Sequence, residues 1–316
     1  MGRLARPPRH DLPTRPNLKR MISRKVELIT TNERQTTLAR AGRLQGHSVK
    51  DFQPCEAELL PAAADTGIVF EVGETRMPAT TDFLLENGPT HTTGVTAAGQ
   101  VILTVEHFLA AVRAAGVDNL LVRVGERGLP LPDFAAVEYW KVLGECGRTE
   151  LAAPRRVLAV RSEMRLEAAD DEGRFAVVRP GAAPDDEVLR ARVIFEEPVG
   201  DREVEYRHGQ TDFGKELAPA RSFVPHGLDA ERWARVRQRY PVLPEDPKLS
   251  PLVVFAEGAF ITPTRFPDEP TRHKMVDLIG DLALAGYRMR GDVFVSKPGH
   301  RFNAALARRL REEAGL

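Results

Sequence analysis

The chain has 316 residues, enough for one large domain or two of ordinary size, and its 42% hydrophobic and 28% charged residues are typical of a globular protein. Lys plus Arg and Asp plus Glu number 45 each, so the net charge of zero provides no general attraction to nucleic acid or to an anionic membrane. Its two cysteines exclude a disulfide framework and a Cys-x-x-Cys metal site, and no apolar run reaches the roughly 18 residues that a membrane-spanning helix needs.

Residues 1–20 are basic and rich in proline, and they lack the apolar core of a signal peptide. Such a composition favours a disordered arm. Met21 precedes the first regular pattern, so a second interpretation is that the protein starts there. The cysteine usage favours a reducing compartment.

The first half of the chain predicts strands followed by two helices. Short alternating runs between residues 35 and 70 are typical of strands. Residues 105–115 have the apolar spacing of a buried helical face, and Gly116 is a helix stop. A strand over 119–124 follows, and a second helix is predicted from about Phe134.

The second half repeats this order. Strand-like runs between residues 155 and 207 come first, and residues 272–315 then give a helix, a stop at Gly286, a strand, a loop and a last helix. This repetition predicts an α+β protein of two homologous modules, 21–153 and 154–316, each a small sheet layered with two helices. The active site would lie between the modules.

Two histidines occupy equivalent places, each near the start of an apolar helix and beside a carboxylate. They are His107, which follows Glu106, and His273, which lies four residues before Asp277 and therefore on the same helical face. If the modules pack face to face, His107, His273 and Asp277 supply three ligands with an open fourth position, as in a catalytic zinc site. Glu106 faces differently and is a candidate general base. Each pair alone also suits ordinary surface charges, and it is the repeat that favours a metal.

A third histidine, His300, opens the last predicted helix. The helix dipole at that end disfavours an imidazolium, whereas a carboxylate partner would restore it, and Asp281 lies two turns beyond His273. The residue is therefore either a general acid or oxyanion stabiliser, or a simple helix cap.

Four segments closely resemble the zinc-dependent UDP-3-O-acyl-N-acetylglucosamine deacetylase family. They are "ILTVEHFLAAVRAAGVDNLLVRV", "ARSF", "RHKMVDLIGDLALAG" and "SKPGHRFNAAL", and the likeness extends over about residues 35–312. The resemblance implies a cytoplasmic, monomeric amidohydrolase that removes acetate from its UDP-linked acylated sugar in lipid A biosynthesis. It implies no nucleic-acid partner and no integral membrane segment, and it leaves zinc and iron(II) open as the working metal.

The resemblance also assigns roles to individual residues. Those implied in the chemistry are the metal ligands His107, His273 and Asp277, the general base Glu106, the acid His300 oriented by Asp281, and the oxyanion-binding hydroxyl of Ser222. Those implied in substrate binding are Lys274, Phe223 and His47.

The chain departs from the family pattern in three places. The family's His-Ser-Gly reads His-Ser-Val at 47–49, and its Met-Asp-Gly-Ser reads Pro-Asp-Phe-Ala at 132–135. An insert over about 223–260, which holds the acyl chain in the family, has lost its Gly-rich stretch and gained Trp233 and many charges. These departures keep two alternatives open, a paralogous deacetylase of another N-acetyl sugar and a metal-binding homologue without catalysis.

Overall fold

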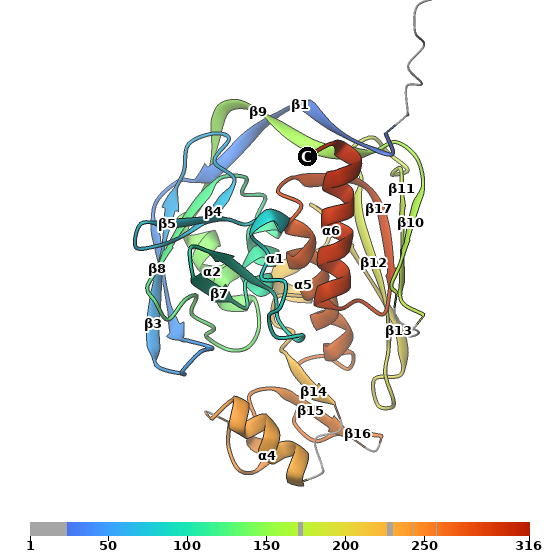
Figure 1. The fold of residues 1–316 in the computed structure, drawn as a ribbon. Helices are drawn as coiled ribbons and strands as arrows, with labels where there is room; N and C mark the ends of the chain where they lie inside the picture. Colours follow the sequence, from blue (N-terminus) through green and yellow to red (C-terminus); the bar gives the residue numbers. More distant parts are fainter. Residues whose placement is uncertain (1–23, 170–172, 226–229, 242, 257) are drawn as a thin grey trace, which may run out of the picture.

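The computed structural model describes residues 24–169, 173–225, 230–241, 243–256 and 258–316. The predicted arm over residues 1–20 lies outside the described residues. Within them, helices and strands layer as expected for an α+β protein, with two helices against each of two sheets (Figure 1). None of the described helices combines the length and the apolar character that crossing a membrane requires.

The first sheet has five strands in the order β2-β3-β8-β4-β5, with β8 parallel to β4 and antiparallel to β3. The strands are β2 (Gly42–His47), β3 (Pro54–Pro61), β4 (Ile68–Val72), β5 (Thr75–Pro78) and β8 (Leu120–Val124). Helices α1 (Glu106–Ala114) and α2 (Val137–Cys146) cover it. The rings of Phe70 on β4, Phe108 on α1 and Tyr139 on α2 contact one another in succession at tilted and edge-to-face angles, with centroids 5.9 and 5.5 Å apart, and join the helices to this sheet.

A short stretch beside α1 carries a one-turn 3-10 helix, η1 (Thr81–Phe83), and the hairpin β6 (Gly94–Ala97) and β7 (Gln100–Leu103). The second helix was predicted from Phe134 but begins at Val137. Phe134 has a φ of 58°, a left-handed conformation that no α-helix continues through. Residues 132–136 therefore form a turn, and the predicted start was wrong by one turn.

The second sheet has seven strands with β17 at its centre. The strands are β1 (Val26–Leu38), β9 (Arg148–Val160), β10 (Met164–Glu167), β11 (Phe175–Arg179), β12 (Glu187–Ile194), β13 (Asp201–Arg207) and β17 (Arg288–Ser296). Helices α5 (Glu269–Ala283) and α6 (His300–Ala314) lie against it, and the short α3 (Phe213–Glu216) follows β13. Gly116 after α1 and Gly286 after α5 both adopt positive φ, 69° and 79°, as equivalent helix stops require.

The two sheets are joined by a long antiparallel ribbon of β1 and β9. At one end of the ribbon, residues 157–159 of β9 pair with β17 of the second sheet. At the other end, Thr37 of β1 bridges to Asn119 beside the first sheet. The predicted module boundary near residue 153 lies within β9. The division into modules itself stays a prediction.

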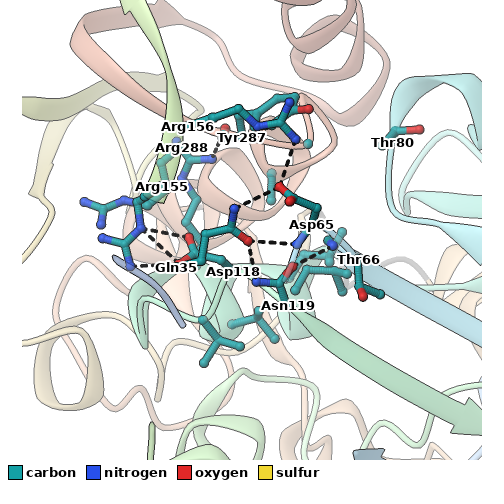
Figure 2. Close-up of a pocket in the computed structure, with 18 of the residues that line it drawn as sticks. Gln35, Asp65, Thr66, Thr80, Asp118, Asn119, Arg155, Arg156, Tyr287 and Arg288 are labelled. Atoms are coloured by element: carbon teal, nitrogen blue, oxygen red, sulfur yellow. Dashed lines mark hydrogen bonds and ion pairs between the residues drawn. The ribbon is translucent and has the colours of Figure 1, made fainter. Parts of the chain in front are cut away.

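A polar network fastens this ribbon to the first sheet and lines a cavity of about 200 Å³ (Figure 2). Gln35 donates to Asp65 over 2.9 Å and accepts from Asn119 over 3.0 Å. Arg155 donates to Asp118 over 2.8 Å. Since these polar groups are paired with one another, the cavity wall is a structural junction between the two halves of the fold.

The described residues between 223 and 260 form a separate lobe below α5, made of β14 (Phe223–Pro225), α4 (Ala230–Arg239), β15 (Val253–Ala256) and β16 (Ala259–Phe260), with a 3-10 turn η2 (Pro247–Leu249) (Figure 1). The lobe has its own small core of Trp233, Leu243, Leu252 and Val254.

Helices α1 and α5 cross at the centre of the molecule, between the two sheets (Figure 1). Gly280 is the closest point of this crossing. A Cβ at that position would lie 1.9 Å from the carbonyl oxygen of Glu106 and 2.9 Å from its Cα, both of them backbone atoms that no side-chain rotation can move away. Only glycine allows the two helices to approach this closely.

We therefore expect Gly280→Ala to push α1 away from α5 and to lower the free energy of unfolding by about 1–3 kcal/mol, the range for overpacking a core. Gly144→Ala is the matched control, because Gly144 also lies within a helix but has open space around its Cβ position. That variant should gain about 0.5–1 kcal/mol from the better helix propensity of alanine. Denaturant unfolding measures both, and equal stability of the two variants would contradict the close crossing.

Candidate metal centre

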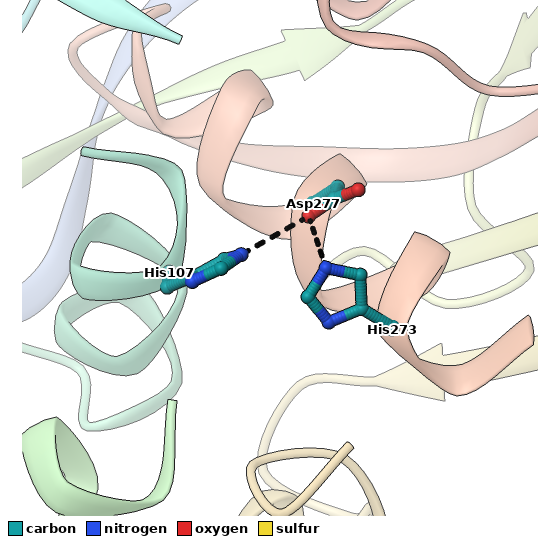
Figure 3. Close-up of side chains that lie close together, drawn as sticks. All are labelled: His107, His273 and Asp277. Carbon is teal, nitrogen blue, oxygen red and sulfur yellow. Dashed lines mark ion pairs between the residues drawn. The ribbon is translucent and has the colours of Figure 1, made fainter. Parts of the chain in front are cut away.

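Three buried side chains meet where α1 crosses α5, and we call them the metal cluster: His107 from the first turn of α1, and His273 and Asp277 from α5 (Figure 3). Asp277 Oδ1 lies 3.3 Å from His273 Nε2 and 3.5 Å from His107 Nε2. One ligand atom from each of the three lies within 4.8 Å of the others. The structure thus brings together the three residues that the sequence predicted as metal ligands from the two equivalent helices.

The donors of the metal cluster suit a cation. Among the described residues Asp277 Oδ1 is buried without a hydrogen-bond partner, although two imidazole nitrogens face it. His273 Nδ1 lies 3.0 Å from the carbonyl oxygen of Ala220, which places its hydrogen there and leaves the Nε2 lone pair towards Asp277. Two imidazole nitrogens and a carboxylate oxygen are a donor set used for zinc and for related transition metals.

The charge states of two cluster members agree with this role. Burial lowers the pKa of His273 to about 4, against the opposing effect of Asp277, so its imidazole is neutral at pH 7. Burial alone would raise the pKa of Asp277, but the neighbouring Lys274 ammonium and the histidines hold it well below its usual range. A neutral imidazole and an ionised carboxylate are the forms that bind metal.

Glu106 precedes His107 at the start of α1 and is buried beside the metal cluster. Its carboxylate accepts hydrogen bonds from the Thr92 hydroxyl over 2.9 Å and from the Thr93 backbone N–H over 3.0 Å. Burial raises the pKa of Glu106, against the opposing charges of His300 and His107. A carboxylate with a raised pKa is a stronger base than an exposed one.

His300 opens α6 with its ring between two carboxylates. Its Nδ1 lies 3.1 Å from Asp281 Oδ2, and its Nε2 lies 3.8 Å from Asp277 Oδ2. Burial alone would lower the pKa of His300, but Asp281 and then Asp277 raise it to about 9. The predicted pairing of His300 with Asp281 is therefore present in the structure, and Asn303 supports it by donating to Asp281 over 2.9 Å.

Lys274 and Phe223 flank the metal cluster. The Lys274 ammonium donates to Asp277 Oδ2 over 2.7 Å and lies 5.4 Å from the centre of the Phe223 ring, which packs 6.0 Å from the His273 ring. Ser222 precedes Phe223, and its hydroxyl donates to the carbonyl oxygen of Phe134 over 3.2 Å. These three residues lie where the lobe that begins at Phe223 meets α5.

His47, predicted to bind substrate, lies apart from the metal cluster. It is exposed at the end of β2 and makes no ion pair or hydrogen bond with the metal cluster in the described part of the chain. It lines a separate cavity of about 320 Å³ together with Phe134 and Arg221. Arg221 follows Ala220, the residue that holds His273, so this cavity borders the same segment.

The sequence interpretation missed four groups that hold the site in place: Thr92, Thr93, Asn303 and the carbonyl of Ala220. Asn303 lies one helical turn after His300, and its polar amide at that i, i+3 spacing on an otherwise apolar face of α6 was the one signal available for it. The threonines and Ala220 lie in irregular segments, where no periodicity indicates which groups face inward.

The chain matches the family model described as UDP-3-O-acyl N-acetylglycosamine deacetylase over residues 35–312. It is 33% identical over 285 residues to a protein of Brucella ovis named UDP-3-O-acyl-N-acetylglucosamine deacetylase, with 88% of this chain and 96% of that protein covered. It is 31% identical over 288 residues to the protein of that name from Psychrobacter arcticus, with 87% and 85% covered. A match over most of the chain, together with the cluster on α1 and α5, confirms the resemblance, and the protein belongs to the UDP-3-O-acyl N-acetylglycosamine deacetylase family.

Proposed function

We propose that the protein is a zinc-dependent hydrolase that removes the N-acetyl group from UDP-3-O-acyl-N-acetylglucosamine, in lipid A biosynthesis in the cytoplasm. The observation that carries this proposal is the buried metal cluster with Glu106 and the His300–Asp281 pair next to it. The family match and the names of the relatives support the substrate.

The metal cluster would hold the zinc ion through His107, His273 and Asp277. Two imidazoles and a carboxylate leave a fourth position for water or substrate, as in other catalytic zinc sites. When bound, zinc would polarise the amide carbonyl and lower the pKa of water. Iron(II) accepts the same ligand types, so elemental analysis of the purified protein decides between the two metals.

Glu106 would act as the general base. It takes one proton from the attacking water, whose oxygen bonds to the acetyl carbon. Hydrogen bonds from Thr92 and Thr93 keep its carboxylate at the start of α1, next to a cluster ligand. The carbonyl oxygen becomes negatively charged at this point, and the Ser222 hydroxyl is proposed to turn from Phe134 towards it.

His300 would act as the general acid at Nε2, because Nδ1 faces Asp281. As the C–N bond breaks, the leaving nitrogen takes this proton, and the products are acetate and a free amine. Asp281 holds the ring in position and stabilises its charged form.

The remaining proposed roles concern substrate binding. Lys274 would contact the diphosphate, with Phe223 and His47 completing the binding surface. We further propose that the chain divides into modules near residue 153 and that residues 223–260 are an insert of the second module that contacts the acyl chain. Phe223, the first residue of this lobe, packs with its ring centroid 6.0 Å from that of His273, which supports that role.

The function is tested by incubating the purified protein with the acylated UDP-sugar and measuring acetate. We expect acetate release that a chelator abolishes and that added Zn²⁺ restores, since the water needs the metal for activation. UDP-N-acetylglucosamine without the acyl chain should be a much poorer substrate. No acetate from either sugar with fully metal-loaded protein would refute the proposal.

Glu106→Gln and His273→Ala should separate the base from a metal ligand. Glu106→Gln keeps the metal cluster intact but cannot accept the water proton, so turnover should fall by about 10²–10⁴-fold with normal metal content. His273→Ala removes a ligand and should lower metal content in elemental analysis. A fully metal-loaded His273→Ala protein, or an active Glu106→Gln enzyme, would move these roles to other residues.

The pH profile of kcat/KM should be a bell. Its alkaline limb follows the loss of the His300 proton, and its acid limb follows protonation of Glu106, whose pKa burial raises above the ordinary value. Asp281 raises the pKa of His300, so Asp281→Asn should move the alkaline limb to lower pH. Asp82→Asn is the control, because Asp82 is an exposed partner of Arg311. An alkaline limb that stays in place in Asp281→Asn would show that His300 only caps α6.

A further inference from the structure

Thr93 is a buried residue that contacts both the proposed general base, Glu106, and Asp281, the partner of the proposed general acid. It lies just before β6 and is 3% exposed. Its backbone N–H donates to Glu106 Oε2 over 3.0 Å, and its hydroxyl donates to Asp281 Oδ1 over 2.6 Å. The same hydroxyl oxygen lies 3.3 Å from His300 Nδ1. Thr93 therefore contacts Glu106, which lies on the helix of the first sheet, and also the His300–Asp281 pair, which lies on the helices of the second sheet.

The hydrogen atoms in this group can be assigned by counting. The single hydroxyl hydrogen of Thr93 is directed at Asp281, so towards His300 its oxygen can only accept. Asp281 also accepts from Asn303. His300 Nδ1 then faces two acceptors, the Asp281 carboxylate and the Thr93 oxygen, and must carry a hydrogen. Any proton that His300 gives to a substrate therefore leaves from Nε2, on the side of the metal cluster.

We propose that Thr93 is a positioning residue that sets the distance and orientation of the His300–Asp281 pair relative to Glu106. The inference rests on the proposed function, since it assumes that Glu106 and His300 act as base and acid. The N–H and the hydroxyl of one residue are separated by fixed bonds, so the two groups they hold are fixed relative to each other. Nothing in the sequence motifs assigned a role to this residue.

The backbone around Thr93 is itself held at the start of α1. The carbonyl oxygen of Thr93 accepts from the N–H of Val105, the residue before Glu106, over 3.2 Å. Its N–H donates to the Glu106 side chain, so both backbone polar groups of Thr93 bind the first turn of this helix. The branched Cβ of threonine restricts χ1, which keeps the hydroxyl aimed at Asp281.

Thr92 offers a matched comparison. Its hydroxyl donates to Glu106 Oε1 over 2.9 Å and lies 2.9 Å from the Thr104 hydroxyl. It thus supports the base, whereas the Thr93 hydroxyl supports the acid pair. Thr96, three residues further on, bonds the carbonyl of Gln100 within the β6–β7 hairpin and serves as a control for the same substitution outside the site.

The test compares Thr93→Val, Thr93→Ser, Thr92→Val and Thr96→Val in kcat, KM, metal content and melting temperature. Thr93→Val keeps the side-chain shape and the backbone N–H but removes the hydroxyl. We expect kcat to fall by about 10–100-fold, the range for losing a partner that orients a functional group, with KM and metal content close to wild type. Thr93→Ser should recover most of the loss, and Thr96→Val should behave as wild type.

A double-mutant cycle with Asp281→Asn shows whether Thr93 acts through the acid pair. If it does, Thr93→Val should cost little in the Asp281→Asn background, whereas Thr92→Val should cost about the same in both backgrounds. Additive losses for Thr93→Val, a change in KM alone, or no rescue by serine in a folded and metal-loaded protein would overturn the proposal.

A readout without catalysis separates this inference from the proposed function. In ¹⁵N-histidine-labelled protein the hydrogen-bonded Nδ1–H of His300, assigned with His300→Ala, should give a proton resonance that is present in wild type and Thr93→Ser and lost or shifted in Thr93→Val. An unchanged resonance in Thr93→Val would reject the positioning role. The absence of acetate release by wild type, with the resonance behaving as expected, would reject only the proposed function.

Discussion

The close crossing of α1 and α5 is the contact on which the site depends. His107 lies on one helix and His273 and Asp277 on the other, so the distances within the metal cluster depend on how closely the two helices approach. That spacing is set at Gly280, whose missing side chain makes room for the backbone of Glu106. Glu106, the proposed general base, is thus also the residue of α1 whose backbone packs against Gly280 of α5.

This crossing buries an unusual concentration of charge. Glu106, Asp277 and Asp281 are each almost inaccessible to solvent, and buried carboxylates are costly unless cations or hydrogen bonds compensate them. Thr93 and Asn303 donate to Asp281, and Lys274 pairs with one oxygen of Asp277. The other oxygen of Asp277 faces the two imidazoles, and a divalent cation there would complete the compensation. Metal binding would therefore also stabilise the fold.

Much of this could be predicted from the sequence, because helix periodicity and the repeated order of elements are local patterns. They located α1, α5 and the glycine stops after them, and the i, i+4 spacing of His273 and Asp277 identified one face of the site. The β1–β9 ribbon, by contrast, depends on pairing between distant segments. The start of α2 was missed because the left-handed conformation of Phe134 follows from its tertiary surroundings.

The proposed function assigns the chemistry and the acyl specificity to different parts of the fold. The metal cluster, Glu106 and His300 lie on α1, α5 and α6, whose positions follow from the central core. The lobe over 223–260 has a separate core around Trp233 and reaches the centre through Phe223, which packs against His273. Substitutions within the lobe can therefore reshape the surface offered to an acyl chain while the helix crossing holds the ligands in place. On the proposed function, the departures of this chain from the family pattern in that lobe would bear on the acyl group it accepts, because the metal cluster, Glu106 and His300 lie outside the lobe.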